Sequence, residues 1–180
     1  KRNAALRQLT FPYETLRPGQ TELMEAVSET FTRGGRLIAE APTGIGKTLA
    51  VLLPALKAMG EGEVDSLYVA TCRNAGKNTI EDALRHLSES LPGLRAITLQ
   101  AKERICRETG SPCDCEICPL ARGFYDRLPE AMKALREEKL WDVGTWSRVA
   151  REHEVCPFAF SMSAAREADV LVGDINYALD

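Results

Sequence analysis

The sequence predicts an α/β protein in which a parallel β-sheet alternates with helices and is interrupted by a mainly helical, cysteine-rich subdomain. Short apolar runs alternate with segments of helical periodicity, which is typical of a doubly wound sheet. A glycine-rich loop lies between the first apolar run and the helix after it. Five of the six cysteines lie in the second half of the chain, where the strand–helix rhythm stops.

The first predicted elements surround the glycine-rich loop. Apolar residues recur at helical spacing over 20–31 and a glycine pair follows them, which predicts a helix. The apolar run over 37–39 fits a buried parallel strand. The apolar segment 49–59 predicts a helix that kinks or stops at Pro54, because proline cannot donate a backbone hydrogen bond.

The remaining predicted elements include a cysteine-rich region and the strands and helices around it. Residues 102–158 contain no convincing strand and are helical where they are regular, so we expect them to form an inserted subdomain. The other predicted elements are strands over 66–70, 94–99 and 169–173, and helices over 79–91, 129–139 and 162–168.

The bulk composition fits a soluble globular protein. With 180 residues, 44% hydrophobic and 27% charged, the chain is long enough for one domain with a small insertion. The net charge of −3 gives no global basic footprint for nucleic acid, although a local basic surface would suffice. The sequence shows no signal peptide and no membrane-length apolar run, so we expect a cytoplasmic location. There, clustered cysteines are more often metal ligands than disulfides.

A phosphate-binding loop occupies residues 41–48. Its glycines let the backbone turn tightly and expose amides to phosphate oxygens at the start of a helix. We expect Lys47 to reach the β- and γ-phosphates of ATP and Thr48 to place its hydroxyl on Mg²⁺, and we assign both a catalytic role. The predicted ATP-binding residues of the loop are Thr43, Gly44, Ile45, Gly46, Lys47 and Thr48.

Arg17 and Gln20 lie about twenty-five residues before the loop and complete the predicted nucleotide site. A glutamine amide can accept a hydrogen bond from adenine N6 and donate one to N7. The other interpretation of Gln20 is an ordinary surface residue at a helix start. Both interpretations are open from the sequence.

The cysteines of the second half form the predicted metal site. Thiolates select zinc or iron–sulfur clusters, and histidine is scarce, although His153 could complete a Cys₃His zinc site with Cys156. Cys115 and Cys118 form a C-x-x-C, whereas Cys113 and Cys118 form a C-x₄-C, so spacing alone prefers Cys115. The cysteines available for four ligand positions are Cys106, Cys113, Cys115, Cys118 and Cys156.

Taken together, these residues resemble the iron–sulfur superfamily 2 DNA helicases similar to DinG and XPD. The resemblance extends over nearly the whole chain, and only its phosphate loop is generic. The segments that carry it are Phe11-Pro12-Tyr13, Arg17-Pro18-Gly19-Gln20, 40–48, 118–127, Cys156-Pro157-Phe158 and 168–180.

The resemblance implies a fold and an activity. Residues 1–101 would be the N-terminal part of a RecA-like motor domain, 102–158 an iron–sulfur subdomain, and 159–180 the return to the motor domain. The whole protein would be an ATP-driven helicase that moves 5′→3′ on single-stranded DNA and acts at duplex junctions. We expect it to be monomeric, to avoid membranes and to work in the bacterial cytoplasm or nucleoid.

The resemblance also implies the ligands of a [4Fe–4S] cluster. In bacterial members the middle ligands commonly read C-x₄-C directly before a proline, an arrangement that Cys113 and Cys118 match. The implied set is Cys106, Cys113, Cys118 and Cys156, with Cys115 as the alternative to Cys113.

The segment after the second predicted strand resembles the motif in which such helicases hold the DNA backbone. It implies DNA contacts by Thr71, Arg73 and Asn74, with Lys77 also able to reach phosphates. Basic residues near the cysteines are candidates for a DNA path, although acidic neighbours partly cancel their charge. They are Lys102, Arg104, Arg107, Arg122 and Arg127.

A second function competes with the helicase: a nucleotide-binding module with a structural zinc knuckle that acts in partner binding. The chain begins without methionine and ends before the acidic Mg²⁺-binding box that the family carries, so we expect a piece of a longer protein. We therefore expect these 180 residues to bind nucleotide weakly and not to hydrolyse it. Whether the protein serves repair, replication or a mobile element stays open.

Overall fold

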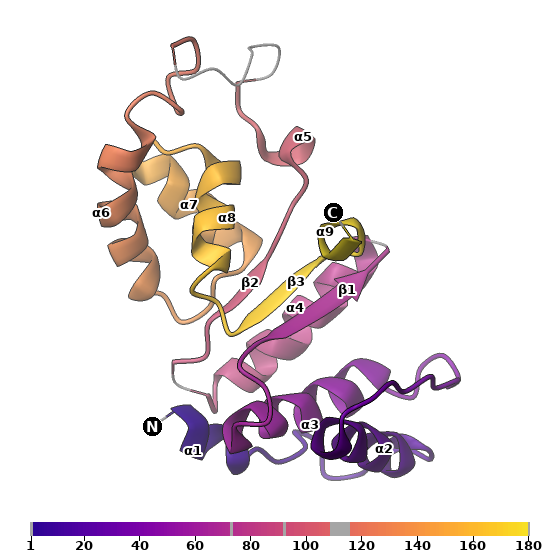
Figure 1. The fold of residues 1–180 in the computed structure, drawn as a ribbon. Coiled ribbons are helices and arrows are strands. Elements are labelled where there is room, and N and C mark those ends of the chain that lie inside the picture. The colour runs from indigo at the N-terminus through magenta and orange to yellow at the C-terminus, as the bar shows by residue number, and fades with distance from the viewer. Residues whose placement is uncertain (1, 73, 92, 109–115, 180) are drawn as a thin grey trace. The chain divides into compact units, whose positions relative to one another are not determined.

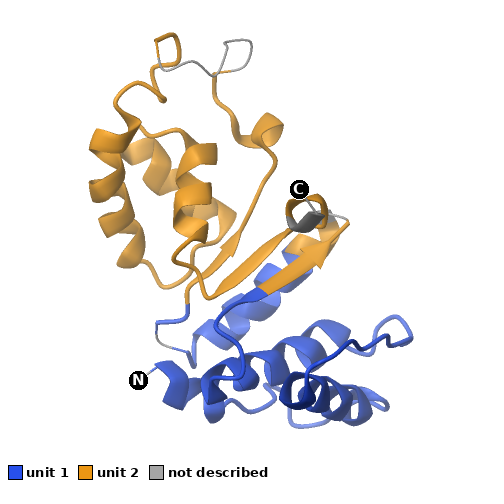
Figure 2. Cartoon of the chain, in the orientation of Figure 1, with its two compact units in different colours: residues 1–67, 78–94 blue, residues 68–77, 95–180 orange. Residues whose placement is uncertain are grey.

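The computed structural model describes residues 2–72, 74–91, 93–108 and 116–179. It divides into two compact units: unit 1 comprises residues 1–67 and 78–94, and unit 2 comprises residues 68–77 and 95–180 (Figure 2). The described elements are α1 (Arg2–Arg7), α2 (Gln20–Arg33), α3 (Lys47–Glu61), β1 (Leu67–Thr71), α4 (Asn74–Ser88), β2 (Ala96–Thr98), α5 (Lys102–Ile105), α6 (Phe124–Arg136), α7 (Val143–Glu152), α8 (Pro157–Ala165), β3 (Val170–Asp174) and α9 (Asn176–Leu179) (Figure 1).

Unit 1 is built around α3, which packs against α1 and α2. Leu23 and Val27, one helical turn apart on α2, meet Ala50 of α3 in an apolar cluster. The helix predicted over 20–31 is confirmed by α2. The helix predicted after the loop is also present, but it runs through Pro54 without stopping. The apolar side chains on both sides of Pro54 are buried, and their packing outweighs the missing hydrogen bond.

The strand predicted over 37–39 does not form. These residues belong to no strand of the described chain, and Ile38 is 99% exposed. A strand is completed by hydrogen bonds to neighbouring strands, which a three-residue apolar run cannot specify. The prediction of a buried parallel strand before the phosphate loop was therefore wrong for this structure.

Unit 2 contains the sheet, except for Leu67 at the start of β1. In the described ranges the sheet has the order β1-β3-β2, and β2 pairs in parallel with β3, with Ile97 opposite Leu171. The predicted α/β class with a parallel sheet is confirmed. The chain leaves the sheet after β2 and returns at β3, and helices α5 to α8 lie in the connection between them (Figure 1).

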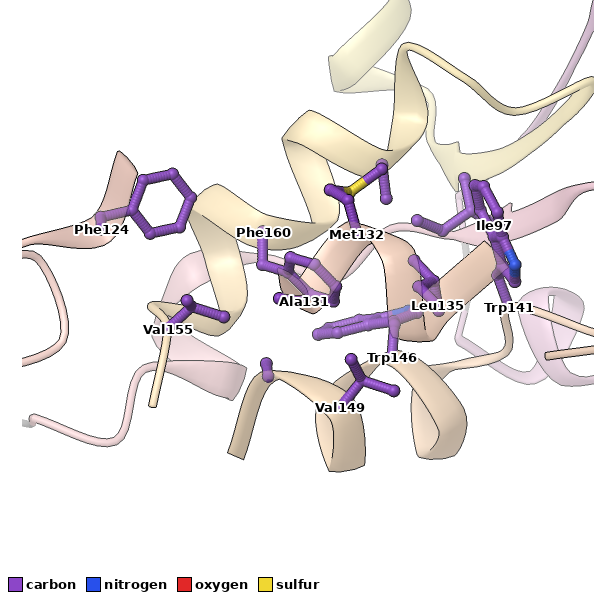
Figure 3. Packing of buried hydrophobic residues seen from close by; sticks show 12 residues of the cluster. Ile97, Phe124, Ala131, Met132, Leu135, Trp141, Trp146, Val149, Val155 and Phe160 are labelled. Atoms are coloured by element: carbon purple, nitrogen blue, oxygen red, sulfur yellow. The ribbon is translucent and has the colours of Figure 1, made fainter. Parts of the chain in front are cut away.

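Helices α6, α7 and α8 share one apolar core, shown in Figure 3. Trp141, Trp146 and Phe160 are fully buried in it, and the Trp146 indole N–H donates to the backbone oxygen of Thr98 at 3.1 Å. That bond attaches the helices to the end of β2. Two of these helices begin earlier than predicted, α6 at Phe124 and α8 at Pro157. The start of α8 is explained by its proline, which fits the first turn of a helix.

Candidate functional site

The phosphate-binding loop leads directly into α3. Gly44 and Gly46 have φ values of 85° and 82°, in the left-handed region that glycine adopts without strain. The Lys47 ammonium donates to the backbone oxygens of Ala41 and Pro42 at 3.0 and 2.7 Å. The lysine therefore lies over its own loop and is held by two of the loop's backbone oxygens.

The structure brings Arg17 and Gln20 to this loop. The Arg17 guanidinium donates to the backbone oxygen of Gly44, and its backbone N–H donates to Gln20 Oε1 at 2.7 Å. Gln20 is only 3% exposed, and its Nε2 lies 2.6 Å from where a side chain at Gly46 would begin. Gln20 is thus a buried residue packed against the loop, not an ordinary surface residue at a helix start.

A cavity of about 640 Å³ lies beside this arrangement, within unit 1. Arg17, Gln20, Gly46 and Thr48 line it together with aromatic residues from the segment before α2. Its volume lies in the range of pockets that hold small molecules and cofactors. The described residues can therefore offer one ligand backbone amides, a hydroxyl and aromatic surface.

Three of the predicted metal ligands line a second cavity, which lies in unit 2. Cys106, Cys118 and Cys156 surround about 420 Å³, and all three are free thiols. Cys118 is buried and the other two are half-buried. They come from the end of α5, the loop before α6 and the start of α8, so the cavity joins distant parts of the sequence.

The remaining ligand predictions are untested by the geometry. Cys113 and Cys115 lie outside the described residues. Within the described ranges, no three His, Cys, Asp or Glu side chains gather closely enough to hold a metal ion. His153 ends α7 and is not among the residues that line the cysteine cavity, which gives the zinc alternative no support from this histidine.

A third cavity, of about 470 Å³, lies at the carboxyl ends of β2 and β3. Lys77 lines it and is 4% exposed, with its ammonium donating to the backbone oxygen of Leu99 at 3.2 Å. Burial lowers the pKa of Lys77, and the nearby Asp174 carboxylate opposes that shift. Lys102 and Arg104 line the same cavity, so three cations meet two carboxylates, Glu103 and Asp174, there.

The structure describes only some of the other residues predicted to contact DNA, and their DNA roles stay predictions. Thr71 ends β1 and is half-buried, whereas Arg73 and the side chain of Asn74 lie outside the described residues. Among the basic candidates, Arg127 donates to backbone oxygens of the loop after Cys118 instead of facing solvent freely, whereas Arg122 is exposed.

Sequence reasoning assigned no role to several residues that line these cavities. Phe11 and Tyr13 line the nucleotide-loop cavity, with ring centroids 6.0 Å apart. Phe124 and Tyr125 line the cysteine cavity, and Phe158 lines both that cavity and the one around Lys77. The sequence did contain a signal that could have identified these residues, because they lie just before Arg17 or just after the cysteines.

None of the helices in the described ranges is both long and apolar enough to span a membrane.

A family model described as DEAD/DEAH box helicase matches residues 17–128. A regulator of telomere elongation helicase 1 homolog from Culex quinquefasciatus is 25% identical over 238 residues, covering 96% of this chain and 24% of the relative. The general transcription and DNA repair factor IIH helicase subunit XPD from Dictyostelium discoideum is 22% identical over 200 residues, covering 94% and 25%.

A probable ATP-dependent helicase from Methanocaldococcus jannaschii is 48% identical over 113 residues, covering 61% of this chain and 16% of the relative. The chain therefore spans about a quarter or less of the length of these curated relatives.

Proposed function

Because the chain belongs to the DEAD/DEAH box helicase family, we propose that the whole protein is an ATP-driven DNA helicase with a [4Fe–4S] cluster. It acts as a monomer that moves 5′→3′ along single-stranded DNA and opens duplex junctions. Residues 1–101 and 159–180 belong to its first motor domain, and residues 102–158 form the cluster subdomain. Relatives named as helicases, one of them a DNA repair factor subunit, support this class of activity.

The observation that carries the proposal is the joined arrangement of Arg17, Gln20 and the phosphate loop beside one cavity. In our mechanism, the loop amides and Lys47 hold the β- and γ-phosphates, and Thr48 positions Mg²⁺. Lys47 then exchanges its bonds to the Ala41 and Pro42 oxygens for bonds to phosphate. Gln20 reads the adenine edge, and the rings of Phe11 and Tyr13 offer it a stacking surface.

The donor set supports the cluster as part of this proposal. Cys106, Cys118 and Cys156 line one cavity, and either Cys113 or Cys115 supplies the fourth thiolate. Thiolate ligands suit iron–sulfur clusters, and when bound the cluster supplies a four-point cross-link between distant segments. The chain's own part is to hold the thiols beside Phe124 and Phe158, whose apolar rings line the same cavity.

Nucleic acid binding is assigned to the carboxyl ends of the strands. In open parallel sheets, ligands bind beyond this edge. The cavity at the ends of β2 and β3 is lined by Lys77, Lys102 and Arg104. Thr71, the last residue of β1, lies six residues before Lys77 in the sequence. Cations of this kind contact phosphates and fix the position of a strand without reading its sequence.

The test is a purification of the full-length protein under anaerobic conditions. We expect a yellow-brown protein with iron and acid-labile sulfide near four of each per chain, and ATP-dependent unwinding of a duplex with a 5′ single-stranded tail. A colourless protein with stoichiometric zinc would instead support the nucleotide-binding module with a zinc knuckle. Unwinding only from a 3′ tail would contradict the proposed direction.

A further inference from the structure

The loop that carries Cys118 is a tight turn. Cys118 is 5% exposed, and its backbone oxygen accepts the N–H groups of Ala121 and Arg122 at 3.1 and 3.0 Å. Leu120 and Ala121 line the cysteine cavity together with Cys118. The conformation of residues 118–123 therefore decides where this thiol lies in the cavity.

Arg127, in the first turn of α6, binds this loop through its guanidinium. Its Nη2 donates to the backbone oxygens of Arg122 at 2.7 Å and of Pro119 at 3.3 Å. Gly123, between loop and helix, has φ 65°, and a side chain there would begin 3.2 Å from Arg127 Nη1. The glycine thus provides both the turn into α6 and the space for the guanidinium.

One donor of the Arg127 guanidinium does not contribute to these bonds. Within the described ranges, Arg127 Nε is buried and has no hydrogen-bond partner. A buried donor without an acceptor destabilises a fold, whereas the oxygens of an exposed loop could bind water at no such cost. The loop oxygens therefore do not depend on Arg127 for a hydrogen-bond partner, and what its two bonds give the loop is a fixed position.

We propose that Arg127 is the positioning residue for the Cys118 thiol, acting through the two loop oxygens that it binds. Its planar guanidinium reaches both oxygens from a fixed direction, which a lysine ammonium on a flexible chain does not reproduce. The consequence for the protein is retention of the cluster. The inference rests on the proposed function, because that function includes the cluster.

The test compares Arg127→Ala and Arg127→Lys with wild type in the full-length protein. The matched control is Arg122→Ala, which keeps the backbone oxygen that Arg127 binds. We expect both Arg127 variants to lose visible cluster absorption about tenfold faster under air or a chelator, since two hydrogen bonds to the loop are lost. The control should lose it at the wild-type rate.

A second readout does not require the cluster. In metal-free protein, the buried Cys118 thiol should react with a thiol reagent about tenfold faster in both Arg127 variants. Near-UV circular dichroism of the buried Trp141 and Trp146 should stay unchanged.

The outcomes separate this inference from the proposed function. Wild-type rates of cluster loss and thiol reaction in both variants would overturn the positioning role, and so would a loss of the tryptophan signal, which would indicate general unfolding. Wild-type protein without iron would refute the cluster, yet faster Cys118 labelling in the variants would still support positioning of the thiol.

Discussion

Lys77 is a buried lysine, and burial disfavours the charged form of its side chain. Its ammonium is almost completely buried and its pKa is lowered, so the folded state bears a desolvation cost. A phosphate in the neighbouring cavity would supply the negative charge that offsets this cost. Asp174 raises the pKa of Lys77 and Arg104 lowers it, so these two charges act in opposite directions.

We predict that Lys77→Met weakens binding of single-stranded DNA by the full-length protein. Loss of one phosphate contact should reduce the slope of log affinity against log salt by about 0.7. Fluorescence anisotropy of a labelled oligonucleotide across a salt series measures this. Lys133→Met, which removes an exposed lysine from α6, is the control of equal charge and should keep the wild-type slope. An unchanged slope in Lys77→Met would exclude a phosphate contact by this residue.

Lys77 also gives a prediction for pH. A pKa lower in the folded than in the unfolded state means that the unfolded chain binds more protons between the two values. The cost of the buried charge is therefore fully present below the folded pKa, falls as the pH rises between the two pKa values, and is gone above the unfolded one. Thermal melts should show that Lys77→Met is at least as stable as wild type at neutral pH and loses that advantage at alkaline pH. A relative stability that does not change with pH would contradict the assigned cause.

At the scale of elements, sequence patterns predicted helices with an apolar stripe well. The helix over 20–31 and the strands around Ile97 and Val172 are present because their periodicity is local information. The run over 37–39 lacked that information, and its pairing depended on partners distant in sequence. The prediction that the helix kinks or stops at Pro54 considered proline alone and could not include the burial of the residues around it.

The candidate sites also differ in whether their residues are close together in the sequence or only in the fold. Gly44, Gly46 and Lys47 were predictable from one contiguous motif. The cavity around Lys77 was not, because its residues come from segments that only the fold brings together. Arg127 was only a candidate for a DNA path on the basis of its charge, and its bonds to the Cys118 loop depend on the path of the backbone.

The contact of α1 with α3 gives a prediction for an element. A side chain at Gly60 would begin 2.7 Å from the Leu6 Cβ and 3.0 Å from the backbone nitrogen of Arg7. Gly60→Ala should therefore displace α1 and destabilise this contact by about 1–3 kcal/mol. Hydrogen exchange should accelerate in peptides from α1 and from the end of α3.

Gly144→Ala is the control for that experiment. Gly144 lies in α7, where the nearest atom to an added side chain is Asp142 Oδ1, at 3.5 Å. This substitution should leave exchange in α1 and α3 unchanged. Equal exchange in wild type and Gly60→Ala would show that the α1 contact is not close-packed in solution.

At the scale of the whole molecule, the phosphate loop lies in unit 1 and the described cysteines of the 420 Å³ cavity lie in unit 2. Each unit has its own buried residues, and the helices α6 to α8 have a core that involves no residue of the loop. Nucleotide hydrolysis and cluster binding should therefore be separable by substitution. This separation is the basis of the last prediction.

In the full-length protein, Lys47→Ala should lower ATP hydrolysis by about 10²–10³-fold, the typical effect of removing one electrostatic group that stabilises the transition state. Unwinding should fall with it, while iron content per chain stays at the wild-type level. Cys156→Ser should also lower unwinding, but with iron lost and DNA-stimulated hydrolysis retained. Parallel assays of iron, hydrolysis and unwinding measure this. If Cys156→Ser lowers hydrolysis and unwinding equally, the cluster only stabilises the fold and does not couple hydrolysis to strand separation.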